Sequence, residues 1–177
     1  IWWGKCLIIV FARERDYHLF EHRVHGSDSS GTAGRCWSYG NGAVHVTFYR
    51  QERESAFAHV LVHEAVHGFL HRYKTPIHIP SWLNEGLADT IAGELVPQDR
   101  SLPLRQRMSK RELRRRGSLE DFFVARQIQG WQYGLASSLT TFMIQQNKRG
   151  YVDMINGIKA GQTWYESIAK NYGVAPE

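Results

Sequence analysis

Apolar and polar residues follow a strand-like order near the start of the chain. The run from Cys6 to Ala12 is apolar and rich in Ile and Val, which is typical of a buried strand. A helix is expected from Asp16 to about Val24. Gly, Ser and Asp then crowd residues 26–34, and this composition indicates a loop.

A hairpin is expected next. Two alternating segments, 35–39 and 43–50, are separated by the Gly-Asn-Gly sequence at 40–42, which favours a tight turn. Because side chains alternate across a strand, the second segment should place Val44, Val46 and Phe48 on one face. That face is expected to be buried.

The pattern then changes from strand to helix. Apolar residues from about Glu54 to Tyr73 surround much of a helical circumference, so this helix should be central and largely buried. Pro76 and Pro80 separate it from a second helix, which begins at Ser81 and runs to about Glu94. Further helices are expected at 118–126, 132–148, 151–159 and 163–172.

This order of elements predicts an α+β fold with an N-terminal sheet and a helical C-terminal half. The 177 residues suit a single domain, 1–177, in which 1–75 form the sheet and one helix and 76–177 form a helical lobe. Hydrophobic residues make up 42% of the chain, which excludes a disordered protein. The longest uncharged apolar run is far shorter than the ~20 residues of a membrane span, so no span is expected.

The net charge of +5 is concentrated in one segment. Eight basic and two acidic residues between Pro97 and Ser118 give that segment a charge of +6. A local basic run is compatible with nucleic acid. It lacks interleaved aromatic residues, so a solvated helix face or loop is the favoured interpretation and nucleic-acid binding is not expected.

The sequence His-Glu-Ala-Val-His at 63–67 carries the first chemical signal. Residues four apart lie on one face of a helix, so His63 and His67 can bind one zinc ion. Glu64 lies beside them, where its carboxylate can accept a proton from a metal-bound water. The pattern continues to His59 and His71, but these should drift off the metal face and serve in packing or at the surface.

A catalytic zinc ion needs a third protein ligand and an open position. Glu85 follows His67 by eighteen residues and lies on the next expected helix, which can return antiparallel to the first. Asp89 is four residues further on the same face. Its carboxylate can accept a hydrogen bond from a ligand imidazole and fix the tautomer.

The two motifs, His63 to His67 and Trp-Leu-Asn-Glu-Gly-Leu-Ala at 82–88, resemble those of the gluzincin metallopeptidases of the thermolysin superfamily. The second motif is particularly similar to that of the zinc aminopeptidases and of small peptidase-MA-like domains. The resemblance covers about residues 54–95. It implies a small thermolysin-like zincin fold, one Zn²⁺ held by His63, His67 and Glu85, Glu64 as the base, and Asp89 as the orienting carboxylate.

The resemblance also implies further site residues. An edge strand should run above the active-site helix and pair with an extended peptide, and 43–50 is the candidate, with Ala43, Val44 and His45 contacting substrate. Related enzymes use a Tyr or His from the helical half to stabilise the oxyanion, a role for which Tyr133 is best placed. His45 stands where the aminopeptidases carry a Glu, so an endopeptidase is favoured.

The sequence therefore predicts zinc-dependent hydrolysis of peptide bonds in a peptide or protein substrate. One alternative is a zinc-binding domain that recognises peptides with little or no catalysis. A second is a nucleic-acid-binding module centred on Arg105 to Arg116. The location stays open, although the peptidase class slightly favours a secreted or periplasmic one, and no targeting segment is recognised. Cys6 and Cys36 can form a disulfide in a secreted protein or remain two buried thiols, and buried thiols are slightly favoured. The oligomeric state stays open.

Overall fold

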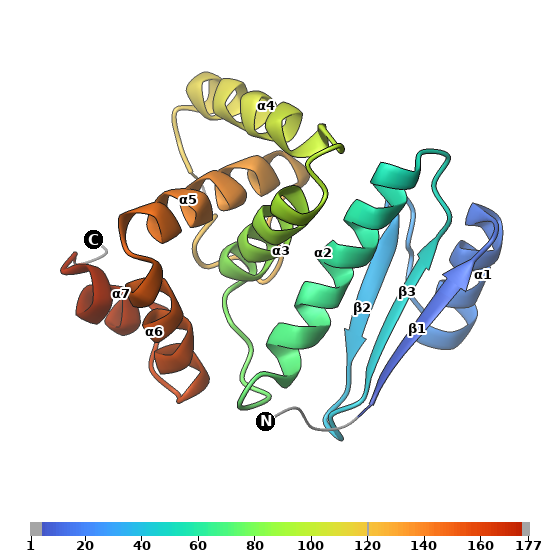
Figure 1. Cartoon of the computed structure of the whole chain (residues 1–177), viewed down its shortest axis with the longest axis horizontal. Helices are drawn as coiled ribbons and strands as arrows, with labels where there is room; N and C mark the ends of the chain where they lie inside the picture. The colour runs from blue at the N-terminus through green and yellow to red at the C-terminus, as the bar shows by residue number, and fades with distance from the viewer. Residues whose placement is uncertain (1–4, 120, 175–177) are drawn as a thin grey trace.

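The computed structural model describes residues 5–119 and 121–174 of the chain. Its N-terminal part is a three-stranded sheet between two helices (Figure 1). The strands are β1 (Cys6–Phe11), β2 (Gly34–Ser38) and β3 (Val44–Tyr49). Helix α1 (Glu14–His25) covers one face of the sheet and α2 (Glu54–Arg72) covers the other.

The strand order is β1-β3-β2, with β1 parallel and β2 antiparallel to β3. The prediction that 43–50 forms an edge strand is therefore wrong, because β3 lies at the centre of the sheet. The hairpin itself is present, but β1 pairs with the other side of β3, from Cys6 opposite Val44 to Phe11 opposite Tyr49. Among the described strands, β1 and β2 form the two edges of the sheet, and the edge strand of the hairpin is β2.

The burial expected for the first strand is also wrong. Strand β1 is an edge strand, and the side chains of Leu7, Ile8 and Val10 are about half-exposed. Cys6 is exposed and Cys36 is partly buried, and both are free thiols, so the buried-thiol interpretation fails for Cys6.

The alternation predicted for β3 is confirmed. Its buried residues Val44, Val46 and Phe48 pack against Cys36 and the apolar side of α2, where they form a small core between sheet and helix. The other face of β3 meets α1, because the Thr47 hydroxyl donates a hydrogen bond of 2.6 Å to the buried Glu21 carboxylate.

The rest of the chain is helical, which establishes the α+β class (Figure 1). A larger core joins α2 to this helical part and centres on Trp82, whose ring lies close to those of Phe122 and Trp164. No helix among the described residues combines the length and apolar character that a membrane crossing requires. The elements are α3 (Ser81–Leu95), α4 (Ser101–Arg116), the short 3₁₀ helix η1 (Gly130–Gln132), α5 (Tyr133–Gln146), α6 (Lys148–Lys159) and α7 (Trp164–Tyr172).

Two differences from the expected helices concern the middle of the chain. The basic segment forms α4, which ends where Gly117 adopts a left-handed conformation with φ 69°. The helix expected at 118–126 is absent from the part of that segment that is described, where residues 121–124 form turns and Glu120 lies outside the described residues. The segment keeps local turn hydrogen bonds, such as that from the Ala125 amide to the Asp121 carbonyl, and it buries Phe122 and Ile128 in the larger core.

Candidate metal centre

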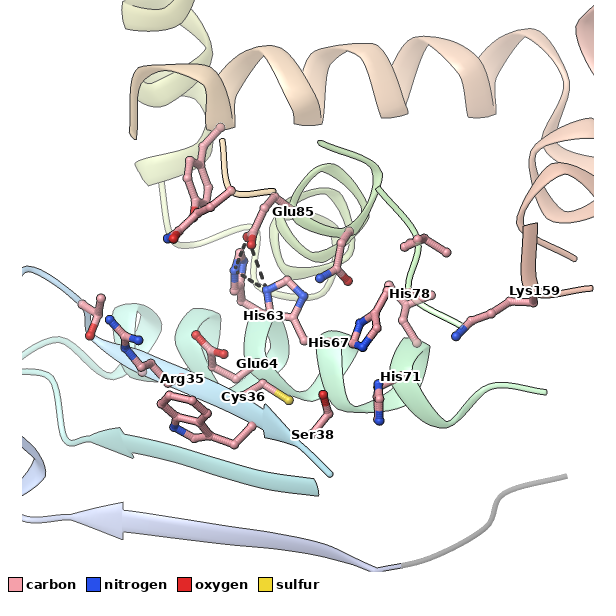
Figure 2. A pocket seen from close by; sticks show the side chains of 18 residues that line it. Arg35, Cys36, Ser38, His63, Glu64, His67, His71, His78, Glu85 and Lys159 are labelled. Atoms are coloured by element: carbon pink, nitrogen blue, oxygen red, sulfur yellow. Dashed lines mark hydrogen bonds and ion pairs between the residues drawn. The ribbon is translucent and has the colours of Figure 1, made fainter. Parts of the chain in front are cut away.

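Three predicted ligands converge where α2 and α3 face one another (Figure 2). His63 and His67 project from one face of α2, and their Nε2 atoms lie 3.0 Å apart. Helix α3 returns alongside α2 and brings the Glu85 carboxylate to them. Its Oε2 atom lies 3.3 Å from Nε2 of His63 and 3.3 Å from Nε2 of His67.

This triangle of donor atoms fits a zinc ion. In a regular tetrahedron with bonds of ~2.0–2.1 Å to zinc, neighbouring donors lie about 3.3–3.4 Å apart. The three observed separations, 3.0, 3.3 and 3.3 Å, are close to one face of such a tetrahedron. Two imidazoles and one carboxylate also suit zinc better than calcium or magnesium, which prefer oxygen donors.

A glycine next to Glu85 sets the position of α3. A Cβ atom on Gly86 would collide with the backbone of Ala136 and the hydroxyl of Thr140, both on α5. Only glycine permits the two helices to approach this closely. The close contact of α3 with α5 therefore determines where Glu85 lies relative to α2.

The carboxylate of Asp89 orients one of the candidate ligands. Its Oδ1 atom lies 2.9 Å from Nδ1 of His63, which favours the tautomer that leaves Nε2 free to bind a metal. Asp89 is fully buried, yet its pKa is lowered, because contacts with His59 and His63 and the charge of Arg105 outweigh the effect of burial. The geometry agrees with the predicted orienting role.

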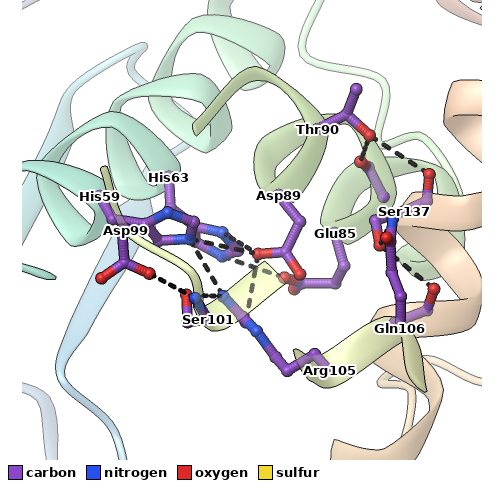
Figure 3. Close-up of polar contacts among 12 residues, drawn as sticks. His59, His63, Glu85, Asp89, Thr90, Asp99, Ser101, Arg105, Gln106 and Ser137 are labelled. Carbon is purple, nitrogen blue, oxygen red and sulfur yellow. Dashed lines mark hydrogen bonds and ion pairs between the residues drawn. The ribbon is translucent and has the colours of Figure 1, made fainter. Parts of the chain in front are cut away.

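Arg105 and His59 complete this charge network (Figure 3). One guanidinium nitrogen of Arg105 lies 3.2 Å from Oδ1 of Asp89, and the other donates a hydrogen bond of 3.0 Å to Nε2 of His59. His59, His63 and Asp89 also lie close enough to hold an ion. The adjacent positive charge of Arg105 repels a metal cation and therefore disfavours metal binding by His59, His63 and Asp89.

Sequence reasoning missed the position of Arg105. Seven other basic residues surround it in the chain, and nothing in their order distinguishes it. His59, expected to serve in packing or at the surface, is buried, and its polar contacts with Asp89 and Arg105 are what the four-residue spacing from His63 did not reveal.

Glu64 lies in the cleft beside the candidate ligands and is 8% exposed (Figure 2). Burial raises the pKa of its carboxyl group, although the neighbouring His63 and His67 lower it in part. A Cβ atom on Gly34 would lie 3.1 Å from Cγ of Glu64, so the glycine lets β2 run close to this side chain. A raised pKa suits a general base that must also release its proton.

Tyr133, the predicted oxyanion donor, lines the same cleft as Glu64 and Glu85. It is the first residue of α5 and is partly buried. Burial and the charges of Glu85 and Asp89 raise the pKa of its hydroxyl, so it stays protonated at neutral pH and can donate a hydrogen bond. Its hydroxyl makes no hydrogen bond to another described residue.

The paired imidazoles hold Glu85 in its charged form. Burial alone would raise the pKa of Glu85, but hydrogen bonds and charges from His63 and His67 outweigh it and lower the pKa to about 2. The carboxylate is therefore available as a ligand across the physiological pH range.

The cleft has a volume of about 340 Å³ and follows the whole length of β2. This volume lies in the range of ligand-binding sites. Ala43, Val44 and His45, predicted to contact substrate, are not among its lining residues. Val44 is buried in the core between sheet and α2. His45 lies on the opposite face of β3, where its ring is 6.1 Å from that of His25 in α1 and its Nδ1 atom is 3.2 Å from the Tyr39 hydroxyl. Strand β2, and not β3 as predicted, therefore runs along the cleft.

No protein-family profile matches the chain, and no curated protein or solved structure is significantly similar to it. The resemblance to gluzincins therefore rests on the two sequence motifs.

Proposed function

We propose that the protein is a zinc-dependent peptide hydrolase of the gluzincin type, acting as an endopeptidase, and that its fold is a small thermolysin-like zincin fold. The observation that carries this proposal is the triangle of His63, His67 and Glu85, with donor atoms 3.0–3.3 Å apart, in one cleft with Glu64 and Tyr133. The comparisons contribute nothing to it.

Each residue has a role that follows from its chemistry. His63, His67 and Glu85 hold zinc, which when bound lowers the pKa of a coordinated water to ~7 and polarises a carbonyl group. Glu64 accepts the proton of the attacking water and passes it to the leaving amine. The Tyr133 hydroxyl donates a hydrogen bond to the scissile carbonyl oxygen as negative charge develops there.

The free edge of β2 is the proposed binding surface for the substrate backbone. Strand β2 borders the cleft from Gly34 to Ser38, and on one side it has no neighbouring strand among residues 5–119 and 121–174. An extended peptide can add to such an edge through main-chain hydrogen bonds. This mode holds the peptide by its middle and favours endopeptidase activity.

Glu64→Gln is the decisive variant. The substitution keeps the shape of the side chain but removes the base, so we expect hydrolysis to fall by about 10²–10⁴-fold. Metal analysis should still find one zinc ion per chain, because Glu64 is not a ligand. Hydrolysis is measured on a peptide library with the zinc-loaded protein, and cleavage sites are read by mass spectrometry.

Glu94→Gln is the matched control, since Glu94 is exposed on α3 and lies outside the cleft. Full activity in Glu64→Gln with zinc bound would contradict the mechanism. A zinc-loaded protein that binds peptides and cleaves no member of the library would favour the peptide-recognition alternative.

A further inference from the structure

The cleft continues beyond the metal centre to a second group of polar side chains. His71 of α2, His78 of the loop between α2 and α3, and Lys159 of α6 all line it. Figure 2 shows these three on the far side of His67 from Glu64. The ring centroids of His71 and His78 are 5.1 Å apart, so two imidazoles from different elements face the same space.

Lys159 is buried, with 1% of its surface exposed. Its Nζ atom donates hydrogen bonds of 2.9 Å to the carbonyl of Thr75 and 2.6 Å to that of Ile77. Thr75 in turn donates a hydrogen bond of 2.6 Å to the carbonyl of Lys159. These bonds fasten the α2–α3 loop to α6 and hold His78 at the cleft.

The ammonium charge of Lys159 has no anionic partner. Both of its acceptors are neutral carbonyl groups, and no described carboxylate lies within ion-pair distance of Nζ. Burial lowers the pKa of Lys159 to about 8, so the side chain is mostly charged at pH 7. A buried, uncompensated charge is costly unless an opposite charge completes the site.

The acidic groups of the cleft all lie in one of its two parts, where Arg35 also lines it. Its acidic lining residues, among those described, are Glu64 and Glu85, and both belong to the metal centre. The other end presents one ammonium group and two imidazoles and no acid. An anionic group of the substrate would supply the missing charge.

We propose that His71, His78 and Lys159 form a carboxylate-binding subsite, which makes the enzyme selective for peptides with a carboxylate near the scissile bond. The inference rests on the proposed peptide hydrolysis. His71 lies four positions after His67 in the helix, a rise of ~6 Å, and an extended peptide advances ~3.4 Å per residue. The selected carboxylate therefore lies about two residues from the scissile bond, on the side of Ser38.

The first test compares hydrolysis of paired peptides by the zinc-loaded protein. Each pair differs only by Asp or Asn at one of the positions within three residues of the cleaved bond. A charge-assisted hydrogen bond contributes enough to favour the Asp peptide about tenfold in kcat/KM at the selected position. A second pair, with a free or an amidated C-terminus, distinguishes a side-chain carboxylate from a chain end.

Substitutions in the subsite test whether it causes the preference for Asp over Asn peptides. His78→Asn should bring the Asp-to-Asn ratio close to one, and because His78 is exposed the substitution spares the core. Lys159→Met should do the same, with circular dichroism to verify its fold. The control is Lys148→Met, which removes an exposed lysine from the start of the same helix and should retain the preference.

A binding measurement separates failure of this inference from failure of the proposed function. Fluorescein-labelled versions of the same peptides are titrated with zinc-loaded Glu64→Gln, and anisotropy reports affinity without turnover. Tighter binding of the Asp or free-acid peptide, lost in the His78→Asn background, supports the subsite even if no peptide is cleaved. Equal affinity for the acidic and neutral peptides would overturn it, whether or not hydrolysis occurs.

Discussion

Asp89 is the residue on which the charges of the metal centre converge. It is fully buried, with His63 at 2.9 Å, Arg105 at 3.2 Å and His59 at 3.9 Å. Three partners around one carboxylate exceed what orientation of a single imidazole needs. The surplus compensates the cost of burying the charge. Contacts with His59 and His63 lower the pKa of Asp89 most, and Arg105 adds a permanent positive charge.

Replacing Arg105 should therefore destabilise the fold. Arg105→Met removes the permanently charged partner of the Asp89 carboxylate and leaves it with two histidines. We therefore expect the free energy of unfolding to fall by about 2 kcal/mol. Urea denaturation of the metal-free protein measures it. Arg107→Met, an exposed position of the same helix, is the control and should change the stability by less than about 0.5 kcal/mol. Equal stabilities of the two variants would show that the Asp89 pair contributes nothing.

For individual residues, the sequence predicted those whose roles follow from spacing along one or two helices. The convergence of His63, His67 and Glu85 follows from two periodic helices joined by a short turn, and Asp89 follows from Glu85. Arg105 belongs to α4 and reaches Asp89 only through tertiary packing. The same holds for Lys159, which is distant in sequence from the loop that it fastens.

Among the secondary-structure elements, the contact of α3 with α5 determines where Glu85 lies. Gly86→Ala places a methyl group against the Ala136 backbone, which cannot move aside without shifting a helix. We expect a loss of about 1–3 kcal/mol in unfolding free energy. Zinc affinity should also fall, because the shift displaces Glu85.

Gly93→Ala is the matched control on the same helix. The added methyl there meets the end of the flexible Leu102 side chain, which can rotate away. Alanine is also the better helix former by up to ~1 kcal/mol, so this variant should be as stable as the parent protein or more so. Urea denaturation and zinc titration compare the two variants. Similar effects from both would argue against a rigid α3–α5 contact.

The elements themselves were largely predictable, but the strand order was not. Helices α2 and α3 have long periodic patterns, and their expected bounds differ from those observed by one residue. The place of β3 at the centre of the sheet depends on a pairing with β1 across more than thirty residues, which no local pattern encodes. The expected helix at 118–126 failed for a related reason, because burial of Phe122 and Ile128 outweighs a local capping signal.

Across the whole molecule, the metal centre lies where the sheet and the helical part meet. Helix α2, with His63 and His67, contributes to both cores, whereas α3, with Glu85, packs against α5 in the larger core. A zinc ion bound by all three residues would add a further link between α2 and α3. Since an unfolded chain does not hold the ligands together, zinc binding adds directly to the stability of the folded state.

Zinc should therefore raise the melting temperature in a manner that requires Glu85. At free zinc ~1,000 times the dissociation constant, the stabilisation is about 4 kcal/mol, which for a chain of this length corresponds to roughly 10 °C. Differential scanning calorimetry with zinc and with a chelator measures the difference. Glu85→Gln should lose most of the shift, whereas His22→Gln, which removes an exposed histidine of α1, should keep it. An identical shift in Glu85→Gln would mean that Glu85 is not a ligand of the stabilising zinc ion, because loss of a ligand weakens zinc binding and so reduces the stabilisation.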